Sequence, residues 1–367
     1  MSPSPRPRRR DAAKHLLHPH QFRDSVAFNR KGYTRNSAVA GAVAALTVLI
    51  ALPLVYYVSP WPHLVGFAAL GALVALFGRF ETRQTRRLKV FQCGLLQLLA
   101  VASISVAAWL GASLHWQLAL LTVMCGVLSL LALKIRVGPP GPLIFIFATS
   151  ASVSANGISL QQLGERLAAV AVVAALAWLL EVLTARLRHE PSETHPYPVE
   201  PIIPLKRLIL IATRCSVGAG LAISISLALG GAYPAWAAMG AMAVMLGLRL
   251  DLVMNRAVQR TVGTLIGALL AWLVLSLSPD VVVVILVLAF LQTATEIVIG
   301  YNYGLGQIFV TPMALLMTWL GAGQTLGPEI APERVFETCI GAVVGVVIAL
   351  ILSGMNDRRH LADMRGQ

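Results

Sequence analysis

Charged residues are scarce in this sequence: they make up 12% of its 367 residues, whereas hydrophobic residues make up 57%. A soluble domain carries roughly 25% charged residues, so this chain has too few charges to cover a water-exposed surface. Apolar runs of about 20 residues recur between Ser37 and Ser353, each long enough to cross roughly 30 Å of hydrocarbon. The composition therefore indicates an all-α polytopic membrane protein. It excludes a secreted enzyme, a cytosolic globular protein and a nucleic-acid binder, despite the formal net charge of +13.

Paired cysteines and catalytic motifs are also missing. The four cysteines lie inside apolar runs without paired spacing, which is typical of small buried residues rather than of a disulfide or metal framework. The chain has no Gly-x-x-x-x-Gly-Lys-Ser/Thr loop, so it does not itself power transport with ATP. It has no His-Glu-x-x-His and no Gly-x-Ser-x-Gly motif. We therefore expect no enzymatic activity, no metal site and no cofactor.

Twelve apolar segments are predicted to span the membrane: 37–58, 61–79, 90–110, 115–134, 141–156, 163–185, 208–229, 233–249, 259–277, 281–300, 304–320 and 332–353. The fifth and eleventh are short and bordered by glycine and proline. The segments form two halves of six, joined by a Pro-rich linker and flanked by two tails: a basic N-terminal tail at 1–36, a first six-helix half at 37–185, the linker at 186–206, a second six-helix half at 207–353 and a C-terminal tail at 354–367.

Lysine and arginine are distributed unevenly between the loops. They occur in both tails and in residues 80–89, 186–206 and 250–258, whereas the alternate loops, such as 111–114 and 321–331, contain none. Because positively charged loops stay on the cytosolic side, both termini are predicted to be cytosolic. The basic tail at 1–36 is expected to be a cytosolic segment rather than a cleavable signal, because the apolar run that follows is too long and too distant.

The two halves carry similar short patterns in the same order. Trp61-Pro62 opens the second segment and Tyr233-Pro234 opens the eighth, while Glu165-Arg166 and Glu333-Arg334 open the sixth and twelfth. Each match is short, but their shared order predicts two six-helix repeats. With an even number of spans in each half, the repeats are expected to run parallel, related by an axis near the membrane normal.

Ionisable and polar residues inside the predicted spans are candidate site residues, because burying them in a bilayer is costly. Gln292 and Glu296 are one helical turn apart and share a face, which favours a polar cavity at this point of the tenth span. Arg214 lies inside the seventh span, where it could bind an anion or reach back to the interface. Arg334 and Glu337, three residues apart, could form an interfacial ion pair or an outer gate that also carries a coupling proton.

Glycine and proline supply further candidates. Gly263 with Gly267 and Gly341 with Gly345 have the four-residue spacing that lets helix backbones approach closely, so packing is favoured over a substrate path. Proline exposes an upstream carbonyl, so the fifth and eleventh spans, which contain or follow prolines, are candidate binding segments or simple kinks. Around the eleventh span, polar side chains could orient a substrate: Tyr301, Asn302, Tyr303, Thr311 and, through its backbone effect, Pro312.

Three segments of the second half resemble the signatures of the fusaric acid resistance, or aromatic acid exporter, superfamily. They are the arginine-rich RAVQRTVGTLIGALL at 256–270, the NYGL at 302–305 with FVTPMAL at 309–315, and RVFETCIGA at 334–342, in which Glu337 replaces the usual aspartate. In the first half, GALVALFGR at 71–79 and VGPPGP at 137–142 look like degenerate counterparts. Larger members carry a sizeable cytosolic domain where this chain has only its linker.

The resemblance implies an exporter of organic, often aromatic, carboxylic acids in a bacterial inner membrane, working with a periplasmic membrane-fusion adaptor. We expect Arg256 and Arg260, which share one helical face, to neutralise a substrate carboxylate together with Arg214. The organic anion and the bilayer are the expected partners, with homo-oligomers as a further option and no nucleic acid. The alternatives are a passive organic-anion channel of the same fold, a major-facilitator-type carrier and a non-transporting membrane scaffold.

Overall fold

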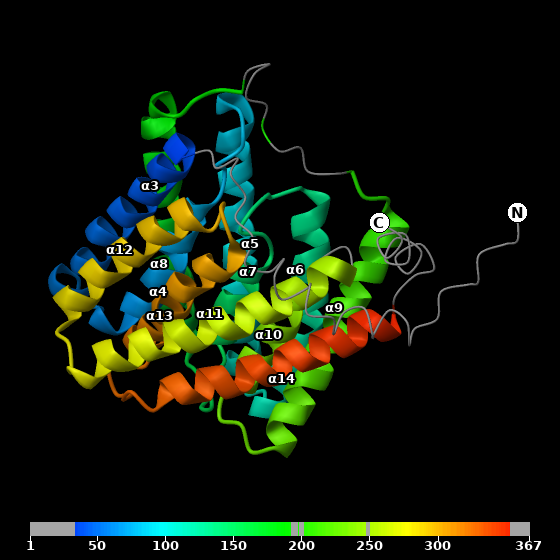
Figure 1. The fold of residues 1–367 in the computed structure, drawn as a ribbon. Helices are drawn as coiled ribbons and strands as arrows, with labels where there is room; N and C mark the ends of the chain where they lie inside the picture. Colours follow the sequence, from blue (N-terminus) through cyan, green and yellow to red (C-terminus); the bar gives the residue numbers. More distant parts are fainter. Residues whose placement is uncertain (1–33, 192–196, 198–201, 247–249, 353–367) are drawn as a thin grey trace, which may run out of the picture.

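The computed structural model describes residues 34–191, 197, 202–246 and 250–352. The predicted C-terminal tail, nearly all of the predicted N-terminal tail and part of the Pro-rich linker lie outside these residues. Within the described residues the regular structure is entirely helical, which confirms the all-α prediction. The arrangement of the helices is shown in Figure 1.

Each half contributes six α-helices to the described residues. Those of the first half are α3 (Thr34–Pro53), α4 (Val65–Ala72), α5 (Arg83–Trp109), α6 (Leu114–Lys134), α7 (Leu143–Ala151) and α8 (Leu160–Leu183). Those of the second half are α9 (Leu205–Ala228), α10 (Pro234–Met245), α11 (Leu250–Ser276), α12 (Val281–Val298), α13 (Tyr303–Gly321) and α14 (Ile330–Ile351). A π turn extends α3, and short 3₁₀ turns flank α4 and extend α8: Leu54–Val58, Pro62–Leu64, Leu73–Leu76 and Thr184–Leu187.

Nine helices in the described part of the chain are long and apolar enough to cross a membrane. The predicted second and eighth spans form shorter apolar helices, at Pro62–Leu76 and Pro234–Met245, and the fifth forms the nine-residue α7. The eleventh span, predicted to be short and interrupted, is instead the continuous 19-residue α13 with Pro312 inside it. A multi-pass membrane protein is therefore supported, while twelve full crossings stay a prediction.

The bundle buries its polar side chains together with an apolar core and leaves many large apolar side chains on its outer surface. On α11, Leu265 and Leu269 are each 57% exposed, whereas Arg260 and Thr264 on the opposite face are buried. This arrangement suits a lipid environment, in which apolar side chains can face the hydrocarbon but polar ones need protein partners. It explains why the sequence can have so few charges and still fold.

Close helix packing depends on the glycine pairs. A Cβ atom on Gly267 would lie 2.7 Å from the carbonyl oxygen of Ile308 on α13, and one on Gly263 would lie 2.6 Å from the Cβ of Gln307. The carbonyl of Ile308 is the one that Pro312 leaves without its helical donor. On α14, a Cβ on Gly341 would collide with the carbonyl oxygen of Ala237 on α10. The predicted packing role of these glycines is confirmed.

The two halves interlock through their first and fourth helices. The α12 helix of the second half packs along α3 of the first (Figure 1), and α6 of the first half packs along α9 of the second. Inside each half the same partners meet: α4 packs on α8 as α10 packs on α14, and α5 packs on α7 as α11 packs on α13. The short helices α4, α7 and α10 lie within this framework, and α7 borders a cavity.

Candidate functional site

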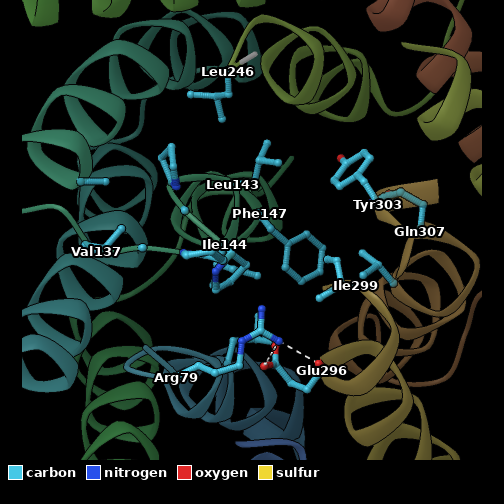
Figure 2. Close-up of a pocket in the computed structure, with 18 of the residues that line it drawn as sticks. Arg79, Val137, Leu143, Ile144, Phe147, Leu246, Glu296, Ile299, Tyr303 and Gln307 are labelled. Atoms are coloured by element: carbon cyan, nitrogen blue, oxygen red, sulfur yellow. Dashed lines mark hydrogen bonds and ion pairs between the residues drawn. The ribbon is translucent and has the colours of Figure 1, made fainter. Parts of the chain in front are cut away.

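A cavity of about 560 Å³ lies where the two halves meet. Its lining combines residues of α6, α7 and the loop between them with residues of α10 to α14. Among the described residues, five arginines and one glutamate contribute to it, a formal net charge of +4: Arg79, Arg136, Arg256, Arg260, Arg334 and Glu296. Most of the remaining lining is apolar, and Figure 2 shows Leu143, Ile144 and Phe147 around its centre.

One side of the cavity carries a cluster of guanidinium groups from α11 and α14. Arg260 donates through Nη1 to Tyr303 Oη at 3.3 Å and to Gln307 Oε1 at 3.2 Å. Arg256, one helical turn earlier, places its guanidinium 5.8 Å from the centre of the Tyr303 ring. Helical spacing accounts for the arrangement, because residues four apart on α11 face residues four apart on α13.

Several donors in this cluster have no acceptor. Arg260 is 3% exposed and Arg334 is 2% exposed, yet Nε of Arg260 and both Nε and Nη1 of Arg334 make no hydrogen bond within the described residues. The Arg334 guanidinium lies 5.0 Å above the ring of Trp236, which offers a π face but no acceptor atom. Buried cations without an anionic partner are costly, so this side of the cavity is suited to receive an anion.

A different wall of the cavity carries an ion pair. Arg79 Nη1 lies 3.1 Å from Glu296 Oε2 and also donates to the Glu296 carbonyl oxygen at 2.7 Å. Both side chains are 4% exposed. Figure 2 shows them at one edge of the cavity, with Phe147 between them and Tyr303. The two basic sides therefore differ: the Arg79 side already holds a carboxylate, whereas within the described part of the chain no carboxylate pairs with Arg260 or Arg334.

The apolar wall comes from α7 and from the loop that precedes it. Residues 136–142, with the sequence RVGPPGP, all line the cavity. Gly138 and Gly141 adopt positive φ values of 68° and 78°, which non-glycine residues rarely do. These turns bring Leu143, Ile144 and Phe147 at the start of α7 into the cavity. The fifth predicted segment, a candidate binding segment or a simple kink, thus borders the cavity.

Four of the predicted site residues meet in this cavity: Arg256, Arg260, Glu296 and Arg334. The sequence placed Arg256 and Arg260 on one face of a helix, and both do face the cavity. Arg334 was predicted at the outer, periplasmic end of the twelfth span, whereas Arg256 and Arg260 were predicted at the cytosolic side. All three nevertheless line the same cavity. The predicted ion pair of Arg334 with Glu337 is not formed among the described residues, because Glu337 Oε1 accepts from Ser226 Oγ at 2.7 Å instead.

Three predicted residues of the eleventh span lie outside the lining and serve the helix itself. Asn302 caps α13, where its side-chain oxygen accepts from the backbone N–H groups of Gly304 and Leu305. Thr311 and Pro312 are buried against Gly267 of α11.

The other predicted residues are also separate from the cavity. Arg214 donates to the Ala349 carbonyl oxygen at 3.4 Å, and Tyr301 lies in the turn between α12 and α13. Gln292 is fully buried one turn before Glu296, and its amide atoms have no hydrogen-bond partner within the described residues. The shared face of Gln292 and Glu296 therefore does not make both of them lining residues.

Tyr303, which the sequence offered together with Tyr301 and Asn302, lines the cavity. Sequence reasoning did not single out Arg79, Arg136 and Gln307 as site residues. Gln307 carries a usable signal, since it lies four residues after Tyr303 on the same helix. Arg79 ends the first-half segment GALVALFGR, which was noted only as a family counterpart. Its contact with Glu296 joins residues 217 positions apart, and no pattern within one helix reveals such a neighbour.

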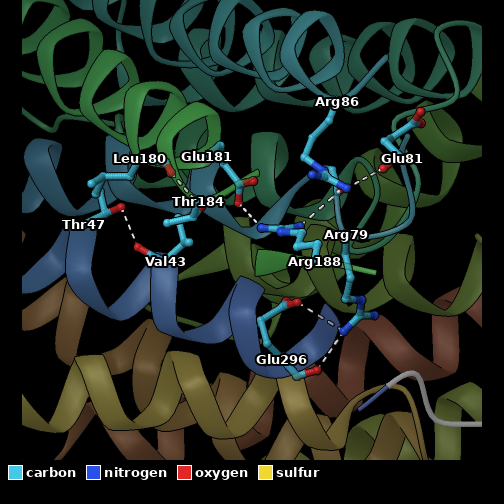
Figure 3. A network of polar contacts seen from close by, with 11 residues as sticks. Val43, Thr47, Arg79, Glu81, Arg86, Leu180, Glu181, Thr184, Arg188 and Glu296 are labelled. Carbon is cyan, nitrogen blue, oxygen red and sulfur yellow. Dashed lines mark hydrogen bonds and ion pairs between the residues drawn. The ribbon is translucent and has the colours of Figure 1, made fainter. Parts of the chain in front are cut away.

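A second polar cluster lies next to Arg79 and is shown in Figure 3. Arg188 forms an ion pair with Glu181, and the two side chains are 0% and 1% exposed. Arg86 donates to the carbonyl oxygens of Gly78 at 3.1 Å and Glu81 at 2.7 Å. These contacts fix the segment that presents Arg79. Among the described residues no group of three or more histidine, cysteine or acidic side chains could hold a metal ion.

Comparison with known proteins finds a family similarity in the second half of the chain. Residues 221–348 match a family described as "Fusaric acid resistance protein-like". The "Uncharacterized membrane protein YvaC" of Bacillus subtilis (strain 168) is 34% identical over 139 residues, which are 38% of this chain and 22% of that relative. The match thus spans about a fifth of the relative's length, and no solved structure matches the chain. Over residues 221–348 the chain is thus similar to the fusaric acid resistance protein-like family, the same family that its motifs resemble.

Proposed function

We propose that this protein exports organic anions, above all aromatic carboxylates, and that the cavity is their binding site. The observation that carries the proposal is the pair of buried arginines Arg260 and Arg334, which line a largely apolar cavity and have guanidinium N–H groups without an acceptor among the described residues. A guanidinium binds a carboxylate through two parallel hydrogen bonds. The apolar wall formed by Leu143, Ile144 and Phe147 supplies a surface for an aromatic ring.

The size and charge of the cavity support this class of substrate. Its volume of about 560 Å³ lies inside the range of roughly 300–1,000 Å³ that is usual for small-molecule sites. A positive lining with low-dielectric walls concentrates anions by focusing the electric field. A cation would meet five guanidinium groups and one carboxylate that is already paired. The geometry therefore favours anions over cations and neutral solutes.

The direction of transport rests on the predicted orientation. Arg136, Arg256 and Gly300 line the cavity near the helix ends that the distribution of lysine and arginine assigns to the cytosol. Arg334 lies in the first turns of α14, which is predicted to begin at the periplasmic side. We infer that the cavity represents an inward-facing state, with Arg334 and Trp236 at its outer limit. Export would then require this outer limit to open.

We also propose that the two halves are parallel structural repeats. The equivalent helix pairings described above support this layout. A second support is a matched contact near the start of the last helix of each half. Arg166 of α8 lies 4.8 Å above the ring of Phe67, as Arg334 of α14 lies above Trp236. A bacterial inner-membrane location, a periplasmic adaptor, a homo-oligomer and proton coupling through Glu337 stay predictions.

Arg260 provides the test of the proposed site. Arg260→Lys and Arg260→Gln should both reach the membrane at normal levels but lose most efflux of aromatic acids. Lysine keeps the positive charge that orients the protein, but its ammonium cannot hold Tyr303 and Gln307 while also presenting a planar pair of donors. The measurement is efflux of a panel of labelled aromatic acids from cells with matched protein abundance.

The exposed Arg87 of α5 is the matched control, since it is predicted to lie on the same side of the membrane but does not line the cavity. Arg87→Gln should therefore export at the parental rate. If Arg260→Lys also exports at the parental rate, Arg260 serves only orientation and the proposed anion site is wrong.

A further inference from the structure

We propose that Glu296 is a tethered competitor of substrate carboxylates: by occupying Arg79, it restricts the cavity to anions with one acidic group and excludes rigid dicarboxylates. The proposal rests on the proposed function, because it concerns the selectivity of the same cavity. It assigns Glu296 to the substrate filter rather than to substrate binding itself.

The contact between Arg79 and Glu296 has the geometry of a bound ligand. The carboxylate lies 3.1 Å from Arg79 Nη1, and both side chains belong to the lining of the cavity. The same Nη1 lies 3.5 Å from the hydroxyl of Ser37, whereas Nε of Arg79 makes no hydrogen bond within the described residues. Arg79 therefore keeps donor capacity that an incoming carboxylate could use if Glu296 were absent.

The two basic sides of the cavity are chemically unequal because of Glu296. Around Arg260 and Arg334 the guanidinium groups have no carboxylate partner among the described residues. Around Arg79, the acidic lining residue Glu296 supplies the carboxylate partner. A substrate can thus place a single carboxylate on the Arg260 side without displacing any protein group.

A second carboxylate at the far end of a rigid substrate would meet Glu296. It would either face a like charge in a water-poor cavity or expel Glu296 from Arg79 and leave that buried carboxylate without a partner. Both outcomes are unfavourable, and repulsion of this kind is a common way to obtain specificity. An uncharged group of the same shape would meet no such penalty.

The neighbouring pair of Arg188 and Glu181 shows why this role does not extend to every buried ion pair. Those side chains are equally buried but do not line the cavity. They join α8 to the segment behind Arg79 (Figure 3) and have no route to a substrate. Among the ion pairs of the described residues, the Arg79–Glu296 pair is the one whose two members both line the cavity.

Three ligands of similar outline separate the possibilities: benzoate, 4-nitrobenzoate and benzene-1,4-dicarboxylate. The nitro group has nearly the shape of a carboxylate but adds no second negative charge. Equilibrium binding to the purified full-length protein should show that the wild type binds the two monoanions and binds the dicarboxylate about 10-fold or more weakly, a difference of about 1.4 kcal/mol. The Glu296→Gln variant should bind the dicarboxylate more tightly than the wild type does, by about the same factor, while its affinity for the two monoanions stays unchanged.

Two further variants complete the design. Glu296→Asp keeps the charge and should keep the discrimination, whereas Arg79→Gln combined with Glu296→Gln should lose the gain, because the second carboxylate then has no cation to bind. A wild type that binds the dicarboxylate as tightly as 4-nitrobenzoate overturns the proposal even if Glu296→Gln fails to fold. So does a Glu296→Gln variant whose affinity changes equally for all three ligands. If benzoate itself does not bind the wild type, the proposed function fails first.

Discussion

Buried arginines are held in two different ways in this protein. Arg188 has a carboxylate partner in Glu181, and neither side chain is exposed by more than 1%. Arg260 and Arg334 are almost as buried, but they line the cavity and have guanidinium N–H groups without an acceptor among the described residues. Since the burial is similar, it is the presence or absence of an internal acceptor that separates arginines that hold the structure together from those that can bind a ligand.

The Glu181–Arg188 pair should therefore be a stability element. Glu181→Ala leaves Arg188 buried without a counter-charge and should lower the free energy of unfolding by about 3–5 kcal/mol. Replacing both Glu181 and Arg188 with methionine should lower the free energy of unfolding by less, because no isolated charge remains buried. Reversible denaturation in a mixed detergent system, followed by circular dichroism, measures both changes.

The exposed pair of His63 and Glu165 is the matched control. His63 is 58% exposed, and Glu165→Ala should change the free energy of unfolding by no more than about 1 kcal/mol. Equal losses for Glu181→Ala and Glu165→Ala would show that burial does not set the importance of these pairs.

The sequence could reveal which residues face inward along one helix, but not which residues of other helices they meet. Arg256 and Arg260 were predicted together because they are one turn apart on α11. Arg79 was missed because its partner Glu296 lies on a helix of the other half. Asn302 was predicted as a substrate ligand because a polar residue before a span fits that role as well as it fits a helix cap, and the backbone contacts decide between them.

At the scale of helices, glycine surfaces position the arginines. The α11 helix meets α13 along Gly263 and Gly267, one and two turns after Arg260. This close approach brings Tyr303 and Gln307 within hydrogen-bond distance of Arg260. The sequence predicted this packing from the four-residue spacing and the short fifth segment that forms α7, but it could not foretell that α4 and α10 are short, because apolar length was counted through their flanking turns.

Gly267→Leu should separate α11 from α13. The leucine would collide with the Ile308 carbonyl and with Thr311, so overpacking should lower the free energy of unfolding by about 1–3 kcal/mol or more. Arg260 would then lose its fixed contacts, and benzoate affinity should fall as well. Leu265→Ala on the exposed face of the same helix is the control and should leave affinity unchanged. A Gly267→Leu variant with parental stability would contradict the packing described here.

At the scale of the whole molecule, the cavity depends on both halves. The first half supplies Arg79, the loop at 136–142 and α7, while the second supplies Arg256, Arg260 and Arg334. Only the second half carries the family match, at residues 221–348. The first-half wall is thus the part of the site that family comparison leaves unassigned, and it contains the apolar surface and the Arg79–Glu296 contact that shape what can enter.

The central claim is that an aromatic carboxylate binds with its acid on the Arg260–Arg334 side. A crystal structure of the full-length protein with 4-bromobenzoate tests it directly, because bromine is located by its anomalous scattering. The account predicts carboxylate density within hydrogen-bond distance of Arg260 and Arg334, and a bromine peak beside Phe147 or Leu143. A bromine peak outside the cavity, or a carboxylate seated on Arg79 in place of Glu296, would contradict it.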